Sequence, residues 1–257
     1  MSDDVEIKDQ GTIKTIRLNR LDKKNAITQD MYSTIADAMD AAQKDGFSAI
    51  VFLGQPGVFS SGNDISDFMT NAMSDDFSSS PTLRFLRALA TCKIPMIAGV
   101  DGLAIGVGTT MLMHCDMVFA TKATTLKTPF LDLGLVPEAG SSLIAPLIMG
   151  QQRAFELLVM GEKFSADRAH AAGLINHIIE EDALEKRVME AAQKLTALPP
   201  EALRLSRGLL RPNEEEILKR IDQEAALFAE RLDSDEAREA FAAFMEKRPP
   251  NFNKPDA

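Results

Sequence analysis

In the first two thirds of the chain, segments whose hydrophobic residues have the two-residue spacing of a β-strand alternate with segments that have the spacing of an α-helix. Two short alternating stretches flank a turn at residues 9–11, which predicts a β-hairpin. Helical periodicity follows at 28–46, from a capping Thr28 to a terminating Gly46, and a buried strand is predicted at 48–54. Strand-like and helix-like segments keep alternating to about residue 180. The sequence therefore predicts an α/β fold with right-handed crossovers.

Further elements continue this alternation up to residue 180. Strands are predicted at 94–100, 116–121 and 174–180, and helices at 81–92, near 107–114 and at intervals up to residue 173. A polar loop separates the strand at 48–54 from the helix at 81–92.

Beyond about residue 181 the strand-like segments stop and helical periodicity remains. We therefore divide the chain into a core at 1–198 and a C-terminal helical region at 199–257. The apolar faces of these helices need a surface to bury against, either the core or a second subunit. They carry Ile217, Ile221, Leu227, Phe228, Phe241 and Phe244.

Composition narrows the choice of function. The 257 residues, 45% of them apolar, suffice for one large packed domain or for a core with an appendage. No apolar run approaches the roughly 18 residues of a membrane span, and a net charge of −10 disfavours nucleic acid as a partner. The chain starts without signal-peptide features and ends without a peroxisomal tripeptide, so we expect a cytoplasmic protein with no membrane association.

The cysteines and histidines predict no disulfide framework and no metal site. Cys92 and Cys115 are too few for such a framework, and the histidines lack metal-ligand spacing. We assign structural roles to all of them, including His114, His170 and His177. The sequence motifs of zinc proteases, serine hydrolases and phosphate-binding loops are absent.

Two glycine-bearing segments, at 59–68 and 99–116, each lie where a strand ends and a helix begins. Backbone N–H groups are exposed at such junctions. The second segment contains half of a dinucleotide fingerprint, but Met111 stands where its third glycine belongs, which disfavours nicotinamide binding. Two separate glycine turns that the fold brings together have the layout of an oxyanion hole.

With the stretch TPFLDLGLVPEAGSS at 128–142, these segments resemble the crotonase, or enoyl-CoA hydratase/isomerase, superfamily. The similarity runs from LNRLDKKNAIT at 18–28 to AAFMEKRPPNF at 242–252, and it is greatest to peroxisomal-type Δ3,Δ2-enoyl-CoA isomerases. It implies a crotonase-like spiral of ββα units with a C-terminal helical trimerisation region, an acyl-CoA thioester substrate and a homotrimer or hexamer. It implies no cofactor, since coenzyme A is part of the substrate.

The resemblance also assigns the catalytic residues. It implies that the backbone N–H groups of Asn63 and Val107 form the oxyanion hole. Family hydratases use two glutamates, and Thr110 and Phe130 stand at these positions here, so ordinary hydration is not expected. Spacing alone makes Glu138 an acid near a helix start, favoured by the helix dipole. The family motif around it instead implies a single catalytic base that moves a proton from C2 to C4 of a 3-enoyl thioester.

Binding residues follow from the same resemblance. Those implied for coenzyme A are Lys23, Lys24, Ala26, Ser61, Asp64 and Ile65, and those for the acyl pocket are Phe68, Met69, Phe130 and Leu135. Two other hypotheses stay open: another crotonase reaction on an acyl-CoA, such as hydration, hydrolysis or dehalogenation, and a non-catalytic acyl-CoA-binding protein.

Overall fold

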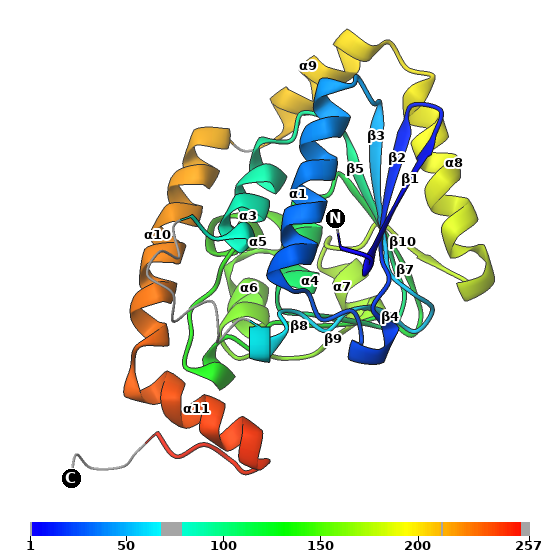
Figure 1. Cartoon of the computed structure of the whole chain (residues 1–257). Helices are drawn as coiled ribbons and strands as arrows, with labels where there is room; N and C mark the ends of the chain where they lie inside the picture. Colours follow the sequence, from blue (N-terminus) through cyan, green and yellow to red (C-terminus); the bar gives the residue numbers. More distant parts are fainter. Residues whose placement is uncertain (1, 68–78, 212, 253–257) are drawn as a thin grey trace.

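A computed structural model describes residues 2–67, 79–211 and 213–252 of the chain. Its main sheet has six strands (Figure 1). In their order across the sheet these are β1 (Val5–Gln10), β2 (Ile13–Leu18), β3 (Ala49–Leu53), β5 (Met96–Val100), β7 (Met117–Thr121) and β10 (His177–Ile179). The hairpin β1–β2 is antiparallel, as expected, and the other neighbours are parallel.

Helices cover both faces of this sheet. Helices α1 (Gln29–Lys44) and α3 (Pro81–Thr91) pack together over one face, and α8 (Leu184–Thr196) covers the other (Figure 1). Every residue of β3 is buried, which is usual for a parallel strand covered on both sides. Thr28 caps α1 as predicted, because its hydroxyl accepts a hydrogen bond from the Met31 N–H at 3.3 Å.

A second, smaller sheet was not predicted. Its strands, in order, are β4 (Val58–Ser60), β6 (Leu103–Ile105), β8 (Thr125–Lys127) and β9 (Phe164–Ser165). Strands of two or three residues are too short to show a period in the sequence. Because β4, β6 and β8 are parallel neighbours, the loops that follow them leave the same edge of the sheet. This edge carries the candidate site.

The other helical segments surround these two sheets. They are η1 (Leu21–Lys23), α4 (Val107–Thr110), η3 (Met111–His114), η4 (Leu131–Leu133), α5 (Ser141–Met149), α6 (Gln151–Leu158), α7 (Ala166–Ala171), η5 (Glu181–Ala183), α9 (Pro200–Leu210), α10 (Glu214–Leu232) and α11 (Asp235–Glu246), where η marks a 3₁₀ helix. The helix predicted near 107–114 is thus one α-helical turn followed by a 3₁₀ turn.

The C-terminal helices bury part of their apolar faces against the core of the same chain. Helix α10 packs on α3 and α5, and Ile217, Ile221 and Phe228 are buried there. Phe241 of α11 is also buried, whereas Leu227 and Phe244 remain about half exposed. The boundary placed between residues 198 and 199 falls between α8 and α9, and the division into two regions stays a prediction.

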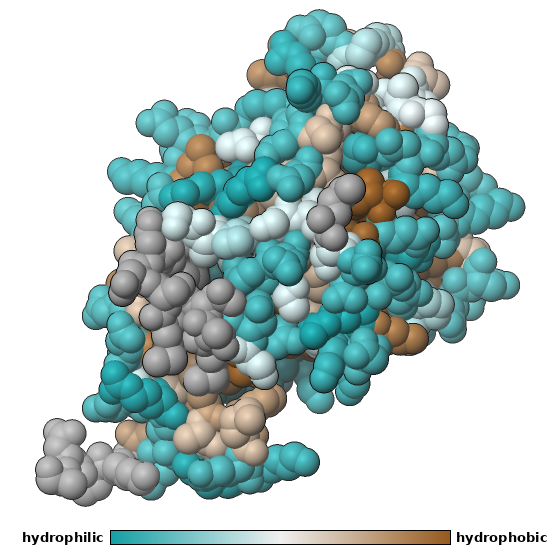
Figure 2. Space-filling model, in the orientation of Figure 1, coloured by the Kyte–Doolittle hydropathy of each residue, from teal (hydrophilic) through white to brown (hydrophobic). Residues whose placement is uncertain are grey.

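The surface agrees with the acidic, polar composition. Figure 2 shows a mostly hydrophilic face on which hydrophobic side chains gather in small patches. Within the described residues, none of the helices combines the length and the apolar character needed to cross a membrane.

Candidate active site

The two glycine turns meet at the edge of the small sheet. They follow Ser60 at the end of β4 and Ile105 at the end of β6, and these strands are parallel neighbours. Gly62 has a φ of +92° and Gly106 a φ of +56°, a region that favours glycine. A Cβ on Gly62 would lie 2.9 Å from the Ile105 carbonyl oxygen. The close approach of the two backbones therefore depends on glycine.

The N–H groups of Asn63 and Val107 both remain available at these turns. Ile27 pairs with the first turn through two hydrogen bonds. The Ile27 N–H donates to the Gly62 carbonyl at 2.8 Å, and the Asp64 N–H donates to the Ile27 carbonyl at 2.9 Å. This pairing leaves the Asn63 N–H unused, and Val107 is the first residue of α4, where an N–H has no partner within the helix. Within the described residues, neither N–H donates a hydrogen bond.

Both residues line a cavity of about 440 Å³. Of the other predicted residues, Ser61, Ile65, Phe130 and Leu135 line this cavity as well. Lys127 and Arg248 also line it, and the sequence analysis did not identify these two cations. The cavity thus combines apolar walls with two cations that are each paired to carboxylates, Lys127 to Asp132 of the same lining at 2.7 Å, and Arg248 to Glu239 and Glu246.

Four of the residues assigned to coenzyme A lie beside the cavity instead of in its lining. Lys23 and Lys24 are exposed on the turn whose backbone receives the Ser61 N–H, at 2.9 Å from the Lys24 carbonyl. Asp64 accepts a hydrogen bond from Arg20 at 2.7 Å, and Arg20 also donates to the Ala26 carbonyl. Phe68 and Met69 of the predicted acyl pocket lie outside the described residues.

Glu138 is buried, with 8% of its surface exposed. It lies in the loop between η4 and α5, and its Oε1 accepts a hydrogen bond from the Thr110 hydroxyl at 2.5 Å. Burial raises the pKa of Glu138 to about 7, the Thr110 hydrogen bond opposes this shift, and the charge of Glu224 adds to it. A carboxylate with this pKa can both take and return a proton near neutral pH.

The acid at the start of α5 is Glu224, not Glu138. The N–H groups of Gly140 and Ser142, at the first turn of this helix, donate to the Glu224 carboxylate at 2.6 Å and 3.0 Å. Glu224 comes from α10 and is itself buried. A purely helix-capping role for Glu138 therefore has no support in the observed hydrogen bonds.

Glu138 and Glu224 line a second, narrow cavity of about 20 Å³. Asn63 and Phe228 line both this cavity and the larger one, so the two adjoin. A space of this size holds about one water molecule. Phe130, assigned to the acyl pocket, lines only the larger cavity.

Two buried residues support the site without having been predicted to do so. The Tyr32 hydroxyl donates to the side-chain oxygen of Asn63, and burial, followed by the charges of Glu138 and Asp67, raises the Tyr32 pKa. A tyrosine on the apolar face of a predicted helix gave no signal for such a role.

His114 is the second of these residues. Its Nε2 lies 2.7 Å from the carbonyl oxygen of Ala139, and burial lowers its pKa to about 4, so its neutral ring donates to that carbonyl. The structural role assigned to it is confirmed, and this role is to hold the residue next to Glu138.

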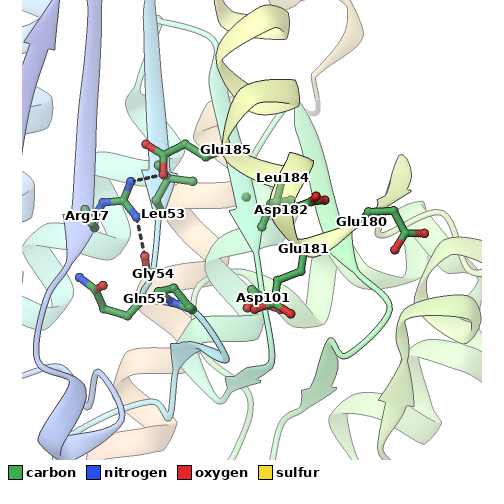
Figure 3. A pocket seen from close by; sticks show the side chains of 12 residues that line it. Arg17, Leu53, Gly54, Gln55, Asp101, Glu180, Glu181, Asp182, Leu184 and Glu185 are labelled. Atoms are coloured by element: carbon green, nitrogen blue, oxygen red, sulfur yellow. Dashed lines mark hydrogen bonds and ion pairs between the residues drawn. The ribbon is translucent and has the colours of Figure 1, made fainter.

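A cavity of about 590 Å³ lies elsewhere and is strongly acidic (Figure 3). The Arg17 guanidinium within it is already engaged, by Glu185 at 2.7 Å and by the Gly54 carbonyl at 2.9 Å. The acidic side chains that line it are Asp101, Glu180, Glu181, Asp182 and Glu185. Such a lining repels the phosphates of coenzyme A, so this cavity is a poorer candidate for the site than the cavity beside the glycine turns.

Comparison with known proteins agrees with this geometry. The sequence model of the family described as Enoyl-CoA hydratase/isomerase matches residues 8–255. Enoyl-CoA delta isomerase 2 of Rattus norvegicus is 35% identical over 245 residues, which cover 93% of this chain and 63% of the rat protein. Enoyl-CoA delta isomerase 3, peroxisomal, of Mus musculus is 33% identical over 95% of this chain and 78% of its own length.

Hydratases are also among the relatives. The 2,3-dehydroadipyl-CoA hydratase of Escherichia coli is 27% identical and covers 95% of this chain and 96% of its own. Among solved structures, Pseudomonas aeruginosa OdaA is 42% identical, with a TM-score of 0.90 and coverage of 95% of this chain and 99% of that one. The mouse relative is named as peroxisomal, and the cytoplasmic location expected for this chain stays a prediction.

The match over residues 8–255, the close structural similarity and the paired glycine turns agree with one another. They confirm the fold expected from the sequence. The chain belongs to the enoyl-CoA hydratase/isomerase family.

Proposed function

We propose that the chain converts 3-enoyl-CoA thioesters to 2-trans-enoyl-CoA, with Glu138 as the only proton-transferring carboxylate. The observation that carries the proposal is the pair formed by Glu138 and Thr110. At one of the two positions where family hydratases place a glutamate, this chain has a threonine whose hydroxyl is bound to the Glu138 carboxylate. One base near its working pKa suffices for a proton shift, whereas it does not suffice for the hydratase arrangement.

The reaction needs one group that accepts and returns a proton, and one site that stabilises the negatively charged thioester oxygen. The Glu138 carboxylate removes a proton from C2, and the electron pair of the C–H bond moves into a dienolate whose oxygen is held by the N–H groups of Asn63 and Val107. The protonated Glu138 then returns the same proton to C4, and the double bond lies between C2 and C3. No water and no oxidant enter the balance.

Glu224 is the only other carboxylate among the described residues that line the narrow cavity, and it is committed elsewhere. Each of its oxygens accepts a backbone N–H, one from Gly140 and the other from Ser142. An acid held in this way is poorly placed to activate a water molecule for hydration. This difference favours isomerisation over the hydratase function of the Escherichia coli relative.

The names of two relatives support the same choice. The rat and mouse proteins, both named as enoyl-CoA delta isomerases, match nearly the whole of this chain. The chain spans only 63% of the rat protein, so the activity named for the rat protein is part of the proposal for this chain.

The test is product identification with a panel of substrates. The purified protein is incubated with 2-enoyl, 3-enoyl and 3-hydroxyacyl thioesters of coenzyme A, and the products are identified by mass spectrometry and NMR. We expect 3-enoyl-CoA to be converted to 2-trans-enoyl-CoA and crotonyl-CoA to be hydrated very slowly. Hydration at about 10 s⁻¹, the median turnover of enzymes in general, contradicts the proposal.

The assembly belongs to the same proposal: the chain forms a homotrimer or a hexamer. Helix α9 presents exposed leucines, with 52% of Leu205, 89% of Leu209 and 86% of Leu210 accessible. Leu147 of α5 is 64% exposed, and it lines one cavity together with Leu210. Apolar side chains gathered in this way on an acidic, mostly hydrophilic molecule suit burial against a second copy.

A further inference from the structure

Glu224 is bound to the turn that carries Glu138. It lies on α10, is 5% exposed, and accepts hydrogen bonds from the N–H groups of Gly140 at 2.6 Å and Ser142 at 3.0 Å. Arg220, one turn earlier on the same helix, donates to the Ser142 hydroxyl oxygen at 3.0 Å. The C-terminal region thus contacts the residues that directly follow the candidate catalytic residue in the chain.

The turn itself has an unfavourable backbone. Ala139 has a φ of +64° and Gly140 a φ of +68°, and the left-handed region costs a residue with a Cβ about 1 kcal/mol or more. Helix α10 also packs directly on this turn, because a Cβ on Gly140 would lie 3.2 Å from Ile217 and 3.4 Å from Ile221. The conformation persists because its neighbours fix it, and Glu224 is the neighbour that binds the Gly140 N–H.

The two carboxylates have unequal surroundings. Both are buried and line the same narrow cavity, but Glu138 has the Thr110 hydroxyl as its donor. Burial raises the pKa of Glu224, and the hydroxyl and N–H of Ser142, the N–H of Gly140 and the charge of Arg220 oppose that rise. Glu224 therefore has two backbone donors and the nearby Arg220 to stabilise its charged form, whereas Glu138 has the single Thr110 hydroxyl.

The other groups near this pair do not supply that charge. Tyr32 and His114 are neutral because they are buried, with the Tyr32 pKa raised and the His114 pKa lowered to about 4. Asp67 acts on Tyr32, and Arg220 acts on Glu224. Glu224 is the acid whose charge raises the pKa of Glu138.

We propose that Glu224 is a positioning residue for the reaction, which clamps the turn at Glu138 and, by its fixed negative charge, makes Glu138 a stronger base. This inference rests on the proposed function, because it assigns the charge a role in proton transfer by Glu138. It also explains why a carboxylate so close to the candidate base belongs to the helical C-terminal region.

The test compares three variants on α10 by the pH dependence of 3-enoyl-CoA isomerisation. Glu224→Gln removes the charge and one of the two acceptor oxygens, so we expect kcat to fall about tenfold or more. The acid limb of the pH profile, where protonation of Glu138 lowers the rate, should move down by about 0.5–1 pH unit. Glu224→Asp keeps the charge but is too short for both N–H groups, so kcat falls while the acid limb stays. Glu230→Gln, an exposed change on the same helix, leaves both unchanged.

The affinity of each variant for a saturated acyl-CoA is measured as well, and it should stay within about twofold of the parent's affinity in all three variants. If Glu224→Gln lowers kcat without moving the acid limb, Glu224 acts through packing alone and the charge effect is refuted. If kcat and the acid limb both match the parent, the whole proposal is overturned.

A measurement without substrate separates this inference from the proposed function. The stability difference between the parent and Glu138→Gln is followed against pH, first with Glu224 present and then in a Glu224→Gln background. Loss of the Glu224 charge should move the midpoint of this difference to lower pH, and an unchanged midpoint contradicts the inference. If no 3-enoyl-CoA is isomerised by the parent, the reaction is wrong, and this cycle still decides what Glu224 does to Glu138.

Discussion

The burial of Glu138 should cost stability at the pH where the residue works. Its pKa is about 7 in the folded chain and 4.5 in its ordinary environment. Between these values the folded state binds more protons than the unfolded state, so stability decreases as the pH rises through this window. The difference of about 2.5 pH units, at about 1.36 kcal/mol for each, corresponds to roughly 3 kcal/mol lost above pH 7.

Glu138→Gln removes this loss. Glutamine is neutral at every pH and can still accept the Thr110 hydrogen bond, so the variant should be more stable than the parent by up to roughly 3 kcal/mol at pH 8.5. Near pH 4.5, where the parent carboxyl is mostly protonated, the difference should shrink towards zero.

Urea unfolding at equal protein concentration, at several pH values between 4.5 and 8.5, measures this difference, and all other titrating groups are common to the two proteins. A stability difference that does not change with pH, or a variant less stable than the parent at pH 8.5, refutes the reasoning. The first result means that Glu138 does not titrate in this window. The second means that its surroundings stabilise the charged carboxylate more than water does.

Two further predictions test the surroundings of the site and the assembly. Thr110→Val removes the donor that favours the charged form of Glu138, so the acid limb of the pH profile of isomerisation should move up by about one pH unit. Thr110→Ser keeps the hydroxyl, and its pH profile should stay near that of the parent. Equal profiles for the two variants contradict the role of the hydroxyl. Leu209→Asp places a charge at an 89% exposed position on α9, so it should leave a monomer unaffected but dissociate a trimer. Light scattering should report a trimer or a multiple of it for the parent and a smaller species for the variant, and a concentration-independent monomer for the parent refutes the proposed assembly.

Local sequence signals predicted the elements well where the elements are long. The cap at Thr28, the hairpin of β1 and β2 and the helical character of the chain beyond about residue 181 follow from spacing and composition alone. The small sheet did not follow, because β4, β6, β8 and β9 form only by pairing with one another across long stretches of chain. The two glycine turns were recognised as candidates, but their meeting depends on that sheet.

The candidate site was predicted in part for the same reason. The positions of Glu138, Asn63 and Val107 follow from a family resemblance. The clamp by Glu224 joins groups 84 residues apart, and no local pattern on an amphipathic helix distinguishes a buried glutamate from an exposed one. Thr110 was read as a missing carboxylate, and only the fold shows that its hydroxyl binds Glu138.

The central claim is that the Glu138 carboxylate moves the proton while the Asn63 and Val107 backbone binds the thioester. The most direct measurement is exchange of the C2 proton of an acyl-CoA with deuterated water, together with 3-enoyl-CoA isomerisation, in the parent and in Glu138→Gln. We expect the variant to bind acyl-CoA like the parent, to isomerise 3-enoyl-CoA about 10²–10⁴ times more slowly and to lose exchange of the C2 proton. A variant that isomerises and exchanges at the parent rate contradicts it, because the base then lies elsewhere in the cavity.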